Sequence, residues 1–225
     1  MLEPNDVRTR ELFTVAEAAM HAGTSPATVR TWLCGVEGQK SKPLFVERPR
    51  DPGAEIWLSF LELVEVIVAR RFRHHGVSLD QLRRTRQNAR MRWKVEYPLA
   101  ERRLKLLGGR VLDDPGEAID LEWPSTQPAL PILAAFATEV FEYDSLEEPN
   151  QDAAWATRFY PAGPEGPLMV DPQFSGGAVT FVNRGVTLDT VVGRRAAGES
   201  VDFIADDLRL VTSRVRAALQ YAGVE

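Results

Sequence analysis

The sequence predicts an α+β fold, mainly helical, in which a winged helix-turn-helix precedes an acidic mixed connector and a C-terminal three-helix module. Three observations support this fold: residues that cap helices precede amphipathic segments, β-prone segments lie beside Pro and Gly, and the two halves of the chain carry opposite net charges. Residues 1–110 hold 20 Lys and Arg against 13 Asp and Glu, whereas residues 111–225 hold 7 against 19. The resulting charges of +7 and −12 predict halves with different partners. We place the domains at 1–97, 98–165 and 166–225.

Two short helices open the first domain. Thr14 and Glu17 form a predicted capping box, and Gly23 ends the helix that follows. Ser25 is the predicted N-cap of the second helix, which ends at Gly35. Two short helices joined by a tight turn are the layout of a helix-turn-helix, whose second helix enters the major groove of DNA.

A hairpin and two further helices are expected next. Residues 44–48 and 55–60 are β-prone and flank the turn PRDPGA, which favours a hairpin that acts as a wing. Apolar spacing predicts a helix over 61–76, and a Ser cap opens another over 78–95. Between Arg70 and Lys94 lie nine bases and one acid, Asp80. Such a concentrated basic stripe favours binding to a polyanion.

The connector and the C-terminal module differ in clarity. In the connector we expect a hairpin over 108–123, a helix over 128–143 and a strand over 155–163, with no base between Val111 and Trp155. The module shows three capped helices, opened by Thr187, Ser200 and Thr212. Their spacing predicts these inward residues: Leu188, Val191, Val192, Phe203, Ile204, Leu208, Val215, Ala218 and Leu219.

Composition argues against several classes of protein. No apolar run approaches the roughly 18 residues of a membrane span, and the first ten residues lack a signal peptide's apolar core, so we expect a cytoplasmic protein. The single Cys34 cannot form an internal disulfide. His74 and His75 are adjacent on a helix and have no ligand cluster near them, so we expect no metal. We find no nucleophile elbow or phosphate loop, and expect no cofactor and no enzyme activity.

Residues 13–87 resemble a MerR-type winged helix. SPATVRTWL stands where that family has a Ser-Pro, Thr-Leu-Arg recognition helix, and the later helices follow in the family's order. Thr31 and Trp32 depart from the usual aromatic pair, and Tyr97 with Pro98 ends the last helix before a long dimerisation coil. The resemblance therefore implies DNA binding without the DNA untwisting of MerR regulators.

Residues 170–221 are similar to the domain of unknown function 433. The family pattern of Asp-Pro, Gly-rich turn, Arg-Gly, Ala-Gly-Glu-Ser, Ile-Ala-Asp and Val-Arg-Ala-Ala-Leu is present in that order, from Asp171 to Leu219. Members are regarded as antitoxins encoded beside a PIN-like ribonuclease toxin, in the VapBC manner. The resemblance thus implies a toxin partner for the C-terminal half.

Candidate DNA-binding residues come from the outer face of the second helix, the wing and the basic stripe. A recognition helix reaches base edges, whereas other arginines position the protein on phosphates. The set expected at bases is Thr28, Arg30 and Thr31. The set expected at phosphates is Arg48, Arg50, Arg83, Arg84, Arg86, Arg90 and Arg92.

The combined hypothesis is an antitoxin that represses its own operon and neutralises a ribonuclease. We expect a homodimer on operator DNA, because helix-turn-helix proteins usually contact two half-sites. An arginine inserted beside the toxin's carboxylates could displace its metal, and the candidates are Arg158, Arg184, Arg194 and Arg195. Two alternatives stay open: a stand-alone MerR-like regulator with a ligand-sensing C-terminal half, and a C-terminal module that is itself a second DNA-binding unit.

Overall fold

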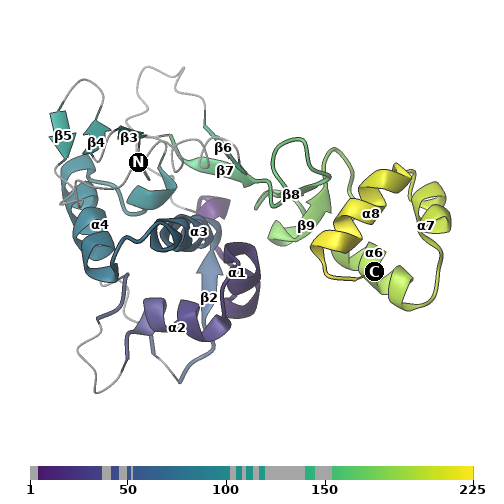
Figure 1. Ribbon diagram of the computed structural model, residues 1–225, viewed down its shortest axis with the longest axis horizontal. Helices are drawn as coiled ribbons and strands as arrows, with labels where there is room; N and C mark the ends of the chain where they lie inside the picture. The colour runs from purple at the N-terminus through teal and green to yellow at the C-terminus, as the bar shows by residue number, and fades with distance from the viewer. Residues whose placement is uncertain are drawn as a thin grey trace. The chain divides into compact units, whose positions relative to one another are not determined.

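The computed structural model confirms an α+β fold and describes most of the chain (Figure 1). The described residues are 5–36, 42–45, 50–51, 53–101, 105–107, 110–113, 117–119, 140–144 and 154–224, and the side chains at 92, 105–107, 110–113 and 117–119 are not included. Contacts divide the chain into two units: Met1–Thr138 with Tyr143–Ala156, and Glu139–Glu142 with Thr157–Glu225. By this division residues 157–165, which we assigned to the connector, group with the C-terminal residues.

The predicted pair of short helices is present in the first unit. α1 follows Thr14, whose side chain and that of Glu17 form the expected capping box, and ends at Gly23 in the left-handed conformation (φ 60°). α2 follows Ser25 and ends at Gly35. α1 packs against both α2 and the later helix α3 (Phe60–His74). The first elements are η1 (Val7–Thr9), β1 (Glu11–Thr14), α1 (Val15–Ala22) and α2 (Pro26–Cys34).

The strand expected as half of the wing has a different partner. β2 (Trp57–Ser59) pairs antiparallel with β1, with Phe13 opposite Leu58. Leu44 and Phe45 are buried outside any strand, and residues 46–49 lie outside the described residues. Within the described residues the second expected strand thus pairs with β1 and not with 44–45, whereas residues 46–48 of the first expected strand lie outside the described part, so the hairpin of 44–48 with 55–60 stays a prediction.

Two longer helices complete the apolar core of this unit. α3 (Phe60–His74) and α4 (Leu79–Trp93) begin at capping boxes of Ser59 with Glu62 and of Ser78 with Gln81. Eleven residues of α3 are buried, and η2 (Pro98–Ala100) packs on both helices. Helix α3 is thus the central element of the unit.

The connector contains the expected hairpin. β4 (Arg110–Asp113) pairs antiparallel with β5 (Glu117–Ile119) and with β3 (Lys105–Leu107). The predicted helix over 128–143 is wrong at its end, where Phe141–Tyr143 forms strand β6. Its residues up to 139 lie outside the described part.

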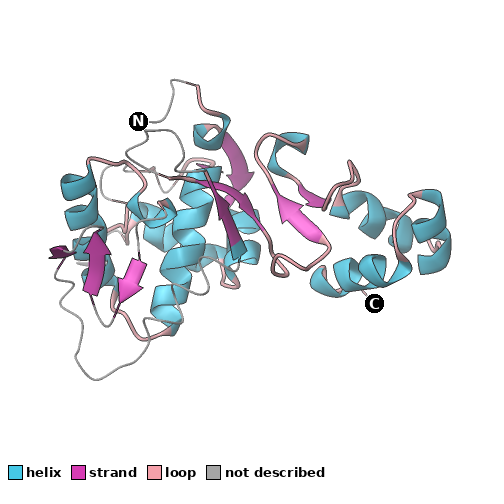
Figure 2. Ribbon diagram, turned by 90° about the horizontal axis from the view of Figure 1, so that it is seen from above, coloured by secondary structure: helices cyan, strands magenta, loops and turns pink. Residues whose placement is uncertain are grey.

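The second unit places a small antiparallel sheet before three helices, which lie together at the C-terminal end (Figure 2). The strand order is β6-β7-β8-β9, with β7 at Ala156–Phe159, β8 at Leu168–Val170 and β9 at Val179–Phe181. A 3-10 turn, η3 (Ser175–Gly177), joins β8 to β9. The helices are α6 (Leu188–Ala196), α7 (Val201–Asp207) and α8 (Thr212–Tyr221).

The core of this unit joins the sheet to the helices. Leu168 and Phe181 of the sheet pack with Val191, Ile204 and Val215.

Two predictions for the C-terminal helices need correction. Phe203 is 58% exposed, because its place on α7 faces away from this cluster, and the N-cap of α8 is Val211, with Thr212 inside the helix.

Candidate functional site

The outer face of α2 presents the residues expected to contact bases. Arg30 is exposed, Thr28 and Thr31 are partly exposed, and Val29 and Trp32 face the core. Thr28 is held at the first turn, where its N–H donates to Ser25 Oγ at 3.1 Å. Arg30 Nη1 donates to the carbonyl of Ala54 at 3.4 Å, a weak contact at the surface. Thr31 Oγ1 donates to the carbonyl of Ala27 at 2.9 Å and Thr28 Oγ1 lies 2.9 Å from Ser25 Oγ, so the helix presents an exposed guanidinium and two hydroxyls that are already hydrogen-bonded locally.

Two arginines of the predicted phosphate set are held by carboxylates inside the unit. Arg86 is 5% exposed, and its Nη2 lies 2.9 Å from Glu65 Oε2. Arg50 lies 2.9 Å from both Glu11 and Glu62. Glu62 also caps α3, so Arg50 attaches its own segment to the start of that helix. Arg86 is buried against Glu65, so its guanidinium does not face solvent, whereas the side chain of Arg50 is 20% exposed and has N–H donors beyond its two ion pairs.

The other arginines predicted to contact phosphates fall into three groups. Arg83 donates to the carbonyl of Pro43 at 3.0 Å and pairs with Asp80, so it fastens the loop at residues 42–43 to α4. Arg84 is exposed and Arg90 is partly exposed. Arg48 and the side chain of Arg92 lie outside the described part of the chain. Arg84 thus keeps the surface position that a phosphate contact needs.

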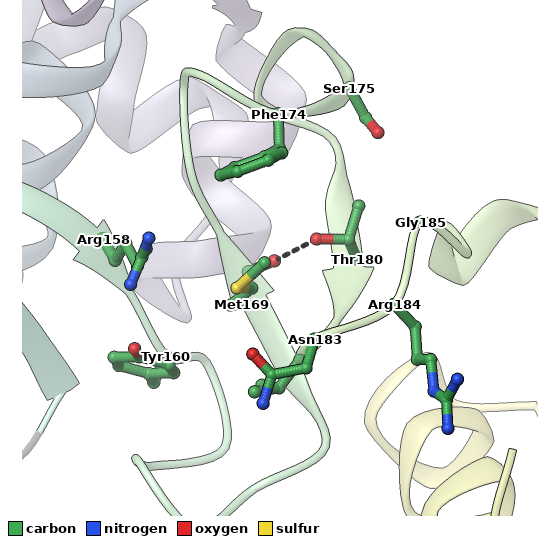
Figure 3. A pocket seen from close by; sticks show the side chains of 10 residues that line it. Arg158, Tyr160, Met169, Phe174, Ser175, Thr180, Asn183, Arg184 and Gly185 are labelled. Atoms are coloured by element: carbon green, nitrogen blue, oxygen red, sulfur yellow. Dashed lines mark hydrogen bonds between the residues drawn. The ribbon is translucent and has the colours of Figure 1, made fainter.

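A pocket of about 350 Å³ opens on the sheet of the second unit (Figure 3). Met169 lies at its centre, Phe174 and Asn183 lie on opposite sides of Met169, and Arg158 and Tyr160 form a third wall. Sequence reasoning selected Arg158 and Arg184 from this region but missed the pocket. The sequence features that point to this pocket are the two glycines at 176–177 and the turn at 183–185, where Asn183 has φ 59°.

Two carboxylates fix the walls of the pocket. Arg158 Nε donates to Asp171 Oδ2 at 2.7 Å, and Arg158 Nη1 lies 3.2 Å from Glu142 Oε2. The hydrogen bond that Arg158 donates to Asp171 raises the pKa of Arg158, so the guanidinium stays charged. Tyr160 donates its hydroxyl to Glu142 at 2.8 Å. Burial and this hydrogen bond raise the pKa of Tyr160, which keeps the hydroxyl protonated.

The four arginines predicted to contact a toxin differ in their surroundings. Arg194 lies 2.6 Å from Glu199 and 2.5 Å from Asp207, and Arg195 donates to the carbonyl of Glu199 at 3.3 Å. Arg158 has the two carboxylates named above. Arg184 is exposed in the turn after β9, and its guanidinium has no ion pair within the described residues. Figure 3 shows it pointing away from Met169.

Over the described ranges, no group of three or more His, Cys, Asp or Glu side chains is placed to hold a metal ion. Among the described helices, none combines the length and the apolar character that crossing a membrane requires.

Comparison with known proteins supports the C-terminal resemblance. Residues 169–222 match the family "Protein of unknown function (DUF433)". The chain is 27% identical over 220 residues to "Uncharacterized protein Rv2308" of Mycobacterium tuberculosis, covering 94% of this chain and 90% of the relative. It is 24% identical over 226 residues to "Putative antitoxin VapB45" of the same organism, covering 92% of each.

A crystal structure shares the fold. The structure of Rv2018 from Mycobacterium tuberculosis matches with a TM-score of 0.63 at 22% identity, over 94% of this chain and 99% of that chain. The likeness extends across both units. The MerR-type resemblance of residues 13–87 stays a prediction.

Proposed function

We propose that the chain is an antitoxin that binds operator DNA with residues 1–97 and neutralises a PIN-like ribonuclease with its acidic C-terminal half, residues 111–225. The observation on which this rests is the similarity over 92% of both chains to the protein named "Putative antitoxin VapB45". The match of residues 169–222 to the DUF433 family agrees with it. A binding protein of this kind has no catalytic residues of its own.

The DNA-binding part is supported by the form of α1 and α2. The two helices are joined by a tight turn at Gly23, and the face of α2 opposite the core carries Thr28, Arg30 and Thr31. Such a face can enter the major groove, where Arg donates to guanine and hydroxyls to either base type. We expect a homodimer, because each chain supplies one recognition helix and repressors usually bind paired half-sites.

The toxin-binding part is supported by charge. Residues 111–225 have a net charge of −12, and a ribonuclease must carry a basic groove for its RNA. An acidic partner that covers this groove excludes RNA. Arg184 is the candidate for insertion among the toxin's carboxylates, because its exposed guanidinium need not leave a described ion pair to do so.

Two experiments test the proposal. The full chain should bind the DNA upstream of its own gene, with affinity that falls steeply between about 50 and 200 mM salt. Co-expression of the full chain with the neighbouring ribonuclease gene should restore growth, and the two proteins should co-purify. A neighbouring gene product that is not a nuclease, or growth that is not restored, would refute the antitoxin assignment.

The second candidate function is a stand-alone regulator that senses a small ligand. The pocket beside Met169 favours it, because its volume of about 350 Å³ suits a small molecule. The two functions differ in their partner. A regulator of this kind binds its operator without any neighbouring toxin, and its DNA affinity changes when the ligand is added.

A further inference from the structure

The pocket of the second unit has an apolar centre and an uncovered aromatic ring. Met169 and Val182 line it, and Phe174 at its edge is 50% exposed. A volume of about 350 Å³ lies within the range of small-molecule sites, which runs from roughly 300 to 1,000 Å³. A ring that entered here would stack on Phe174 and contact the thioether of Met169.

One buried carboxylate links two walls of this pocket. Asp171, which is 4% exposed, binds Arg158 through Oδ2 at 2.7 Å. Its Oδ1 accepts the N–H of Gln173 at 2.8 Å, and its carbonyl accepts the N–H of Phe174 at 3.0 Å. The guanidinium of Arg158 and the backbone of Phe174 are therefore held by the same residue. A site held in this way loses little conformational entropy when a ligand binds.

The backbone around the pocket supports a binding role. Ser175 and Asn183 both line it, and both have a left-handed conformation (φ 48° and 59°) that residues other than glycine rarely adopt. Such conformations persist where the surrounding structure enforces them, and they cluster at ligand sites. Here they turn the chain so that Phe174 and Asn183 lie on opposite sides of Met169 (Figure 3).

The charges decide which ligand fits. Arg158 is flanked by Asp171 and Glu142, so the three groups together have a charge of −1. Arg184 also lines the pocket, but its guanidinium points away from Met169, so its positive charge lies at the rim and does not offset the charge around Arg158 (Figure 3). An anionic ligand is therefore disfavoured, whereas a neutral acceptor can still face the guanidinium of Arg158 and the amide of Asn183.

We propose that this pocket binds an uncharged aromatic ring that bears a carbonyl or amide group, as a free small ligand. The apolar centre and Phe174 receive the ring, while Arg158 and Asn183 donate to its carbonyl oxygen. The site lies in the same unit as the DUF433 match but needs Arg158 and Tyr160, which precede the matched residues. It goes beyond the antitoxin role, and its test uses neither DNA nor toxin.

The four methionines of the chain make the site observable by NMR. In full-length protein labelled at the methionine methyl groups, benzamide should shift the Met169 signal, which a Met169→Leu variant assigns. Met20 and Met91, which are 51% and 64% exposed, are internal controls and should not move. Benzoate should bind more weakly than benzamide because of its charge, and acetamide, which has no ring, should cause no saturable shift.

A matched pair of variants locates the ring. Phe174→Ala should weaken benzamide binding about three- to tenfold, because the stacking partner is lost. Phe203→Ala removes an equally exposed phenylalanine from α7 and should leave the affinity unchanged. Both side chains are surface-exposed, so each variant should fold. No saturable Met169 shift with benzamide, tighter binding of benzoate, or equal loss in both variants would overturn the proposal.

Discussion

Arg86 of α4 binds Glu65 of α3 inside the first unit, with Nη2 2.9 Å from Oε2 and Nε 3.1 Å from the same oxygen. Glu65 also accepts the N–H of Leu99 at 3.1 Å, and the guanidinium of Arg86 lies 4.9 Å from the centre of the Phe45 ring. The pair thus joins α3, α4, η2 and the segment at Phe45. An arginine from the centre of the basic stripe therefore serves the fold.

Replacement of Arg86 should lower stability. Arg86→Ala leaves Glu65 buried without its partner, and we expect the free energy of unfolding to fall by about 3 to 5 kcal/mol in urea titrations. The double variant Glu65→Leu with Arg86→Met should recover most of this loss, because it removes both charges. A loss below about 1 kcal/mol in the single variant would contradict a structural role for Arg86.

The exposed Arg84 should behave in the opposite way. Arg84→Ala should change stability by less than about 0.5 kcal/mol. It should weaken binding to all duplexes alike and lower the slope of log affinity against log salt by about one, because one phosphate contact is lost. Fluorescence anisotropy over a salt series measures this slope. An unchanged slope would remove Arg84 from the DNA-contact set.

Arg30 should determine sequence preference. Arg30→Ala should cost about 1 to 3 kcal/mol on the native operator and much less on unrelated duplexes, because a contact to base edges is specific. Arg214→Ala is the control, since Arg214 is also an exposed helix arginine but lies on α8. Competition binding with both duplexes measures the ratio. Equal losses on both duplexes would move Arg30 from the base contacts to the phosphate contacts.

The sequence predicted the helix starts because their signals are local. At Thr14, Ser25 and Ser78 the side chain of the N-cap residue accepts the backbone N–H of the residue three positions later, so both partners can be identified from the sequence. Strand pairing is not local. Trp57 pairs with Thr14, which no nearby residue reveals, and this is why the pairing of β2 with β1 was not predicted.

The candidate site was harder to predict than the fold, because the charge composition of a segment does not show which carboxylates its arginines pair with in the folded chain. Arg50 was expected on a phosphate, yet its carboxylates are Glu62 and Glu11, the latter 39 positions away. Phe203 follows the spacing of an inward residue, but it is exposed beside Arg194, 5.7 Å from the centre of its ring. The pocket at Met169 combines β7, β8, β9 and two turns, so only the folded chain reveals it.

His21 should make stability depend on pH. Burial lowers its pKa to about 4, although the charge of Glu17 opposes the shift, so the folded state keeps it neutral. As pH falls below about 6.5, His21 becomes protonated in the unfolded chain but stays neutral in the folded chain, so the free energy of unfolding declines until about pH 4. Relative to His21→Gln, the wild type should lose about 2 kcal/mol between pH 7 and 5 in urea titrations. Parallel pH profiles would refute this.

Arg184 should matter for neutralisation more than the other three candidate arginines. Its guanidinium is exposed and lacks a described ion pair, whereas Arg158 and Arg194 are each held by two carboxylates. Insertion beside a toxin's carboxylates therefore breaks no described ion pair at Arg184, whereas Arg195, which has none either, would first have to release the carbonyl of Glu199. Arg184→Ala should reduce affinity for the toxin by about 2 to 5 kcal/mol, as measured by calorimetry, and weaken growth rescue. Arg214→Ala, a matched exposed arginine, should retain both. If Arg184→Ala instead rescues growth as well as the wild type while Arg194→Ala does not, the inserted arginine lies on α6, and the turn after β9 is not the inhibitory element.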